Sequence, residues 1–172
     1  MQTAQRNDGA KPVAFVTGAS YGIGAACALA LARDGYDIAV AATRESNLAK
    51  TVAALQPSGC RVLALALDLN AQASIEQTFS AVVATFGRVD VLVNNAGIQH
   101  VSPVEDFPVE RWDSVIAINL SSAFHTTRLA LPAMREAKWG RIINVSSAHG
   151  LVRSEEHTSE LQSRGLISYA VF

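Results

Sequence analysis

The chain has 172 residues, of which 49% are hydrophobic and 17% charged, and its 14 basic and 15 acidic residues leave a net charge of −1. This composition supplies a core for one compact domain and excludes a disordered chain. The near-neutral charge argues against nucleic acid or an anionic membrane as a partner, and two cysteines exclude a disulfide scaffold or a structural zinc site.

In chain order, residues 1–12 are predicted to form a polar N-terminal tail without a signal-peptide core, and no apolar run reaches membrane-spanning length. We therefore expect a cytoplasmic protein with no metal site. Residues 13–152 then alternate short apolar runs with helical stretches, and residues 153–172 break the pattern.

The apolar runs predict five strands: Val13–Thr17, Asp37–Ala42, Arg61–Leu67, Val89–Asn94 and Arg141–Ser146. The stretches between them predict four helices: Ile23–Arg33, Glu45–Leu55, Ala71–Phe86 and roughly Pro108–Ala137. Because the runs lack strict in-and-out alternation, we expect parallel strands covered on both faces. The alternation of strand and helix predicts an α/β fold, a Rossmann-like doubly wound parallel sheet ending after its fifth strand.

Local signals support these elements. In the third predicted helix, the spacing of Ile75, Phe79, Val83 and Phe86 indicates one apolar face. Gly35 follows the first helix, where a C-terminal cap is expected.

The segment TGASYGIG (Thr17–Gly24) lies between the first strand and the first helix. Gly18 permits a tight turn, Gly22 removes a side chain where backbone approaches a pyrophosphate, and Gly24 allows close packing of helix on strand. The free N–H groups of the helix start favour an anion, although a glycine turn can also be purely structural. The predicted phosphate-binding residues are Gly18, Ser20, Tyr21, Gly22, Ile23 and Gly24.

This G-x-x-x-G-x-G spacing occurs together with NNAG (Asn94–Gly97) after the fourth strand, Asp68 after the third, Asn119 in the long fourth helix and Ser146–Ser147 after the fifth. With these motifs the chain resembles the short-chain dehydrogenase/reductase family, over residues 13–152. The resemblance implies a partial NAD(P)-binding domain.

The resemblance also assigns the remaining cofactor contacts. Asp68, with Leu69 beside it, is expected to bind the adenine, and the alternative for Asp68 is capping of the helix that follows. Asn95, Ala96 and Gly97 are expected along the ribose side of the cofactor, where the alternative is a simple turn.

The choice between NAD and NADP depends on the end of the second strand. An acidic residue there would bind a ribose 2′-hydroxyl, but the chain has Ala42, followed by Thr43 and Arg44. Arg44 could pair with a 2′-phosphate or be only a solvated charge, so the residues favour NADP slightly.

In this family a serine orients the substrate oxygen, a tyrosine transfers its proton, a lysine tunes that tyrosine, and an asparagine positions a water. Ser147 and Asn119 match the serine and the asparagine. The alternatives are a hydroxyl capping a turn and a buried polar group that bonds backbone inside a helix. The Y-x-x-x-K pair expected after Ser147 is absent, so we expect no useful turnover from this chain.

From Asn94 to Val152 the sequence is most similar to one group of the family, the bacterial D-3-hydroxybutyrate dehydrogenases. That resemblance implies NAD as cofactor and carboxylate binding by Gln99 and His149. The alternative for Gln99 is an exposed amide, and the alternative for His149 is an ordinary surface histidine. The first half is more similar to 3-oxoacyl-carrier reductases or sugar and polyol dehydrogenases.

The last twenty residues, Arg153–Phe172, have no apolar periodicity. Their segments RSEEHTSELQS and ISYAVF resemble the conceptual translation of a short-read sequencing adapter. We therefore expect a non-native tail, for which the alternative is a natural polar loop followed by a short strand.

The expected partner is a small hydroxy or keto acid. The resemblance implies a homodimer or homotetramer for the intact parent, with the long fourth helix in the subunit interface. Two hypotheses from other classes remain: a non-enzymatic dinucleotide-binding module, and an assembly fragment without function.

Overall fold

The computed structural model describes residues 10–147. The segment 153–172 and most of the N-terminal tail lie outside these residues. The five strands are β1 (Val13–Thr17), β2 (Asp37–Ala42), β3 (Val62–Ala66), β4 (Val91–Asn94) and β5 (Arg141–Asn144). The α-helices are α1 (Gly22–Arg33), α2 (Ala49–Leu55), α3 (Gln72–Phe86), α4 (Val109–Ile116) and α5 (Ser122–Glu136).

The strands form one parallel sheet in the order β3-β2-β1-β4-β5, which confirms the predicted doubly wound fold. In the register, Ala14 of β1 lies between Ile38 of β2 and Val91 of β4. The chain moves outward from β1 to β3 and then returns to place β4 on the other side of β1. The loops after β1 and β4 therefore diverge, which leaves a crevice at the carboxyl edge.

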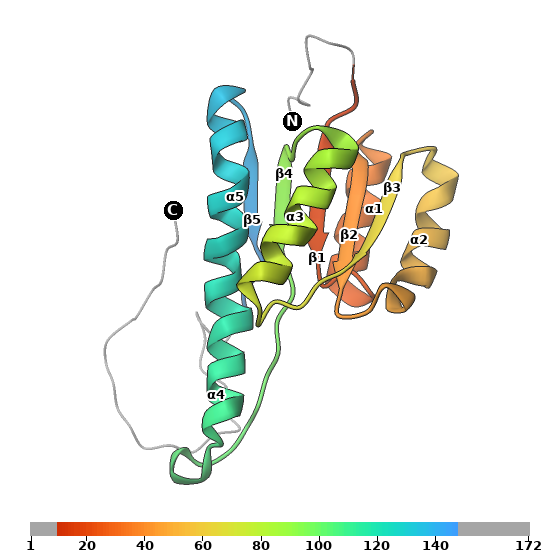
Figure 1. Ribbon diagram of the computed structural model, residues 1–172. Helices are drawn as coiled ribbons and strands as arrows, with labels where there is room; N and C mark the ends of the chain where they lie inside the picture. Colours follow the sequence, from red (N-terminus) through yellow and green to blue (C-terminus); the bar gives the residue numbers. More distant parts are fainter. Residues whose placement is uncertain (1–9, 148–172) are drawn as a thin grey trace.

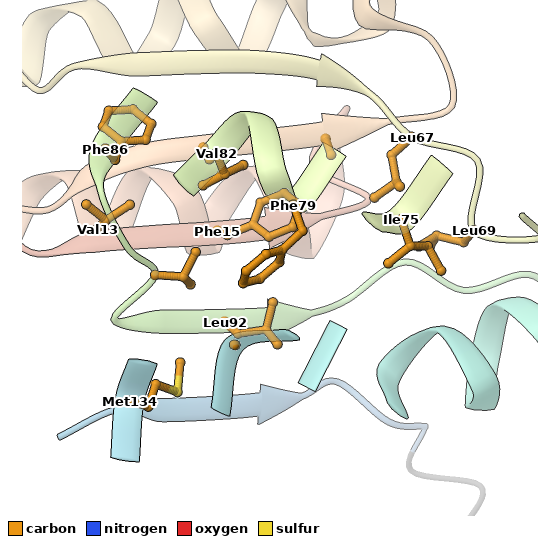
Figure 2. Packing of buried hydrophobic residues seen from close by; sticks show 14 residues of the cluster. Val13, Phe15, Leu67, Leu69, Ile75, Phe79, Val82, Phe86, Leu92 and Met134 are labelled. Atoms are coloured by element: carbon orange, nitrogen blue, oxygen red, sulfur yellow. The ribbon is translucent and has the colours of Figure 1, made fainter. Parts of the chain in front are cut away.

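Helices cover both faces of the sheet (Figure 1): α1 and α2 pack on one face, and α3 and α5 on the other. Every residue of β1 and β2 is buried, as expected of central parallel strands. Figure 2 shows the core between the sheet and α3, where Phe15 meets Phe79 edge to face with ring centroids 6.3 Å apart. Truncating such a buried ring to alanine costs about 3–5 kcal/mol.

The buried face of α3 differs from the predicted one by one residue. Val82 is fully buried, whereas Val83 is 36% exposed, so the prediction for Val83 was wrong. The face runs through Ile75, Phe79 and Val82 to Phe86, and a step of one residue rotates Val83 about 100° away from it.

Several element bounds also differ from the sequence prediction. The second predicted helix opens as a 3₁₀ turn, η1 (Glu45–Leu48), before α2, and β3, β4 and β5 are each shorter than predicted. The fourth predicted helix is interrupted by a π-helical turn, η4 (Ala117–Ser121), which separates α4 from α5. Strand β5 is mostly exposed rather than covered on both faces, because β4 is its only neighbour among the described strands.

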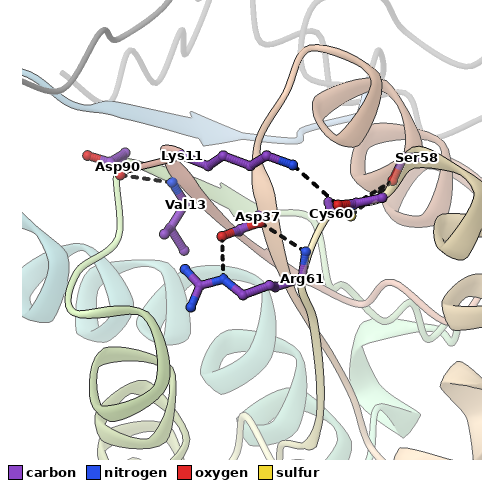
Figure 3. Close-up of polar contacts among 8 residues, drawn as sticks. Lys11, Val13, Asp37, Ser58, Cys60, Arg61 and Asp90 are labelled. Carbon is purple, nitrogen blue, oxygen red and sulfur yellow. Dashed lines mark hydrogen bonds and ion pairs between the residues drawn. The ribbon is translucent and has the colours of Figure 1, made fainter. Parts of the chain in front are cut away.

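Buried carboxylates tie strands together at the amino edge of the sheet, away from the crevice (Figure 3). Asp37 accepts hydrogen bonds from the backbone N–H of Arg61 (2.9 Å) and from its Nε (2.7 Å), which joins β2 to the start of β3. Asp90 accepts one from the N–H of Val13 (2.8 Å). Asp90 also forms an ion pair with Arg88. These carboxylates fix the ends of the strands whose other ends form the site.

Candidate functional site

A cavity of about 700 Å³ opens at the carboxyl edge of the sheet, where β1, β2, β3 and β4 end. This volume lies in the range of small-molecule and cofactor sites, and the position is the topological switch point of the fold. The cavity is lined by Gly18, Ser20, Tyr21, Gly22, Ile23, Ala41, Ala42, Thr43, Asn47, Leu67, Asp68, Leu69, Asn70, Asn95, Ala96, Gly97, Ile98 and Ile118.

The turn between β1 and α1 requires glycine at two points. A Cβ on Gly18, whose φ is +65°, would lie 2.7 Å from the Cα of Ala96. A Cβ on Gly24 would lie 2.5 Å from both the Gly18 carbonyl oxygen and the Asn95 Nδ2. The turn is therefore packed tightly against the end of β4. The positive φ of Gly18 fits the tight turn predicted there, and the close contacts at Gly24 fit the close packing predicted for that residue.

Gly22 has a different environment, because a Cβ there would meet nothing within 4 Å. It opens α1, and Tyr21 before it makes no side-chain capping bond to the helix. The first N–H groups of a helix have no partner within the helix and carry the positive end of its dipole. Open space beside such groups is suited to an anion.

A network centred on Thr17 and Asn95 joins the turn to β4. The Oγ1 of buried Thr17 accepts hydrogen bonds from the backbone N–H groups of Asn95 (3.1 Å) and Ala96 (3.2 Å). In return, the Nδ2 of Asn95 donates to the carbonyls of Thr17 and Gly18, each at 3.0 Å. Asn95 thus holds the glycine turn through its side chain, a role the sequence did not reveal.

Asn94, the preceding residue, braces the sheet. Its Nδ2 donates to the Oδ1 of Asn144 on β5 (2.9 Å), and its Oδ1 accepts from the Oγ1 of Thr126 on α5 (2.8 Å).

Asp68 lies in the cavity wall but does not cap α3, so the capping alternative was wrong. The residue at the N-cap of α3 is Ala71. The Oδ1 of Asp68 instead accepts hydrogen bonds from the N–H (2.9 Å) and the Nδ2 (3.1 Å) of Asn70, as in an Asx turn. Asp68 is the one charged residue in the lining of this cavity within residues 10–147.

At the end of β2 the cavity is lined by Ala42, Thr43 and Asn47. The predicted Arg44 is exposed and is not part of the lining, although it adjoins Thr43. In the described part of the wall this corner carries neither an acidic nor a basic side chain.

Asn119 sits in the π-helical turn between α4 and α5, a kind of irregularity that is frequent at functional sites. Its Oδ1 accepts from the N–H of Ile98 and its Nδ2 donates to the Ile98 carbonyl, both at 2.8 Å. Asn119 is exposed and bonds a loop after β4, so the alternative of a buried amide bonded within its own helix was wrong.

The remaining predicted residues lie apart from the cavity wall. Ser147 and Gln99 are exposed and do not line the cavity. His149 lies outside the described residues. Gly24 lies behind the turn, where it packs against Asn95. The structure therefore gathers ten of the twelve predicted cofactor residues, and it leaves the serine and the substrate residues untested.

Sequence reasoning missed Asn47, Asn70, Ile98 and Ile118 in the lining, and Thr51 behind it. Asn70 could have been found, since an Asp-x-Asn spacing directly after a strand is typical of an Asx turn. Ile98 directly follows the predicted Gly97, whereas Asn47, Ile118 and Thr51 come from other elements and no local pattern marks them.

Within residues 10–147 no group of three or more His, Cys, Asp or Glu side chains could hold a metal ion. In the same part of the chain no helix is both long and apolar enough to cross a membrane.

Comparison with known proteins places the site in context. The model of the family described as short chain dehydrogenase matches residues 12–159, beyond the predicted boundary at Val152. D-beta-hydroxybutyrate dehydrogenase of Cupriavidus necator is 48% identical over 157 residues, which are 91% of this chain and 61% of that protein. The chain therefore spans only about six tenths of the length of this curated relative.

Two solved structures share the fold. A metagenomic short-chain oxidoreductase in complex with NADP superposes with a TM-score of 0.77 at 38% identity, covering 81% of this chain and 63% of that one. An NAD+-bound xylitol dehydrogenase gives a TM-score of 0.77 at 34% identity, covering 83% of this chain and 55% of that one.

Proposed function

Because the chain belongs to the short-chain dehydrogenase family, we propose that its cavity binds NAD or NADP and that the protein acts as an oxidoreductase on a 3-hydroxy or 3-keto acid. One observation carries the cofactor proposal: the glycine turn at the start of α1 is packed against Asn95 and Ala96 yet open at Gly22. When bound, the nicotinamide cofactor supplies or accepts hydride.

The cavity residues fit the parts of such a cofactor. The N–H groups at the start of α1 suit the pyrophosphate, and Asp68 is an acceptor for the adenine amino group. Asn95, Ala96 and Gly97 lie on the wall formed by the end of β4 and suit the ribose. Asn119 bonds the backbone of Ile98 and so fixes the position of the chain that follows Gly97 beside the cavity.

The choice of cofactor rests on the corner formed by Ala42, Thr43 and Asn47. An acidic side chain there would repel a 2′-phosphate, and its absence from this corner favours NADP slightly. Similarity to a D-beta-hydroxybutyrate dehydrogenase favours NAD, since that group is expected to use it. The solved relatives include one complex with each dinucleotide.

For the substrate we propose a short 3-hydroxy acid, supported by the 48% identity to a D-beta-hydroxybutyrate dehydrogenase. Gln99 and His149 would bind its carboxylate, and Ser147 would orient the reacting oxygen. A 3-oxoacyl-carrier reductase or a polyol dehydrogenase is the alternative within the family. None of the three tyrosines is followed four residues later by lysine, so we expect no turnover from the 172-residue chain itself.

We propose that the protein is cytoplasmic and forms a homodimer or homotetramer. The assembly is supported by a stripe of exposed apolar side chains, spaced four residues apart along α4, η4 and α5: Trp112, Ile116, Leu120 and Phe124.

The cofactor proposal is tested by titrating the full chain with NAD and NADP in a calorimeter and comparing Gly22→Asp with Gly59→Asp. Both glycines have positive φ (+60° and +64°) and open space for a side chain, but only Gly22 lines the cavity. A carboxylate at position 22 repels the pyrophosphate, so we expect Gly22→Asp to bind the dinucleotide at least tenfold more weakly. Gly59→Asp should bind it with the affinity of the unsubstituted chain. Equal affinities of the two variants would contradict the proposal.

The tail is tested at the level of DNA. We propose that residues 153–172 come from a sequencing adapter. Resequencing the locus across codon 153 should then show a coding sequence that does not encode RSEEHTSELQS. A genomic sequence that encodes this segment would overturn the proposal.

A further inference from the structure

The wall of the cavity at the end of β3 contains an arrangement that the proposed cofactor contacts do not explain. Asp68 stands between Leu67 and Leu69, which are 5% and 9% exposed and both belong to the core packed on α3. Because the leucines on both sides point into the core, the intervening carboxylate is directed away from it, and Asp68 is exposed in the cavity wall.

The backbone of Asp68 is held at both of its polar groups. Its N–H donates to the Oγ of Ser74 in the first turn of α3 (3.0 Å), and its carbonyl accepts from the N–H of Ala71 (3.3 Å). The position of the Cα is therefore fixed, and the remaining freedom of Asp68 is rotation of its side chain.

Asn70 removes that freedom. Its backbone N–H and its Nδ2 both donate to one carboxylate oxygen, Oδ1, at 2.9 and 3.1 Å. Within residues 10–147, the second oxygen, Oδ2, receives no hydrogen bond from the protein and takes part in no ion pair. The two oxygens thus have different tasks: one is occupied by Asn70, and the other is available to a ligand.

From this geometry we propose that Asn70 is a positioning residue for adenine recognition, which acts by presenting the Oδ2 of Asp68 to the 6-amino group of the cofactor. The proposal rests on the proposed dinucleotide site. An ionised carboxylate accepts hydrogen bonds and cannot donate them, so it favours a 6-amino purine over a 6-oxo purine. A carboxylate already aligned by Asn70 loses less side-chain entropy when it binds.

The test separates recognition of the purine from binding of the rest of the dinucleotide. The full chain is titrated with NAD, NADP and their hypoxanthine counterparts, in which a 6-oxo group replaces the 6-amino group. We expect the adenine forms to bind about tenfold more tightly, the size typical of a hydrogen bond to a charged group. This comparison needs no variant.

Asn70→Ala then tests the positioning role. We expect its affinity for the adenine forms to fall roughly fivefold and its affinity for the hypoxanthine forms to change less than twofold. Gln72→Ala is the matched control, because that exposed amide donates to Glu76 and not to Asp68. In an Asp68→Ala background, Asn70→Ala should have no further effect.

Melting curves check that each variant folds. If Asn70→Ala does not fold, Asn70→Ser, which keeps a polar side chain, takes its place. An equal loss of affinity for adenine and hypoxanthine forms would assign Asn70 a structural role only and overturn the proposal. Equal affinities of the unsubstituted chain for the adenine and the hypoxanthine dinucleotides would also overturn it. Failure of all four dinucleotides to bind would instead overturn the proposed function, and this inference with it.

Discussion

The hydroxyl of Thr51, on α2, donates a hydrogen bond of 2.8 Å to the backbone carbonyl of Ala19 in the glycine turn. Thr51 is 4% exposed and also lies 3.3 Å from the carbonyl of Ser20. The N–H of Ala19 in turn donates to the carbonyl of Ala41 on β2 (3.1 Å). The turn is therefore anchored from α2 and β2 on one side, and from Asn95, which follows β4, on the other.

Thr51→Val removes this anchor while keeping the shape of the side chain. We expect about threefold weaker dinucleotide binding, and a loss of about 1–2 kcal/mol in the free energy of unfolding because a buried carbonyl loses its donor. The control is Thr78→Val, since the buried Thr78 donates to Ala66 on β3, away from the turn. Calorimetry and urea unfolding measure the two effects, and equal binding by both variants would argue against the anchor.

Gly24→Ala should destabilise the protein more than Gly22→Ala. The new Cβ at Gly24 would lie 2.5 Å from the Gly18 carbonyl oxygen, so the helix and the turn must move apart, at a cost of about 1–3 kcal/mol or more. Gly22→Ala meets open space and costs only the strain of its positive φ, about 1 kcal/mol. Thermal melts of the two variants give the order, and the reverse order would contradict the close packing.

Tyr36 should make the protein less stable at alkaline pH. Burial raises the pKa of Tyr36 above its ordinary value of 10.0, the carboxylates of Asp90 and Asp34 raise it further, and Arg141 opposes them. The folded state thus favours the neutral phenol, so this contribution to stability is fully present below the unfolded pKa and is lost as pH rises through the folded pKa.

The measurement for Tyr36 is urea unfolding at about pH 8 and about pH 11. Tyr36→Phe should reduce the fall in stability between these two values. Tyr21→Phe is the control, since that ring is 82% exposed, and it should leave the fall unchanged. If the free energy of unfolding has the same pH dependence in the unsubstituted chain and in Tyr36→Phe, Tyr36 is not the group responsible.

Phe124→Glu should weaken self-association. Phe124 is 63% exposed and belongs to the apolar stripe of α4, η4 and α5, and burying a carboxylate in such an interface is unfavourable. The control is Val83→Glu on α3, another exposed apolar position outside the stripe. Sedimentation velocity should show a shift to smaller species for Phe124→Glu alone. An unchanged distribution for that variant would place the interface elsewhere.

Much of the fold followed from local patterns. The bounds of β1 and β2 were predicted without error, because fully buried parallel strands are continuous apolar runs between polar turns. The edge strands and the long helix were less predictable. β5 is exposed because of its place in the sheet, and Asn119 in the π-helical turn bonds Ile98, 21 residues away in the chain.

The candidate site divides in the same way. Glycine spacing identified Gly18, Gly22 and Gly24. The positive φ of Gly18 and Gly22 is a local demand of the turn, whereas the close contacts of Gly18 with Ala96 and of Gly24 with Asn95 are visible only in the structure. Arg44, two residues beyond the end of β2, is exposed and outside the cavity lining, and its contact with a 2′-phosphate stays a prediction. Asn47 entered the lining without any signal in its neighbours.

By itself, the sequence determined the order of strands and helices, the turn at the start of α1 and the family to which they belong, because each depends on periodicity or on motifs a few residues long. Only the tertiary structure decided that Asn95 and Thr51 hold one turn from opposite sides, and that Asn70 leaves a single oxygen of Asp68 available. Those relations join atoms through hydrogen bonds whose existence depends on how the elements pack, and packing brings together residues that are far apart in the chain.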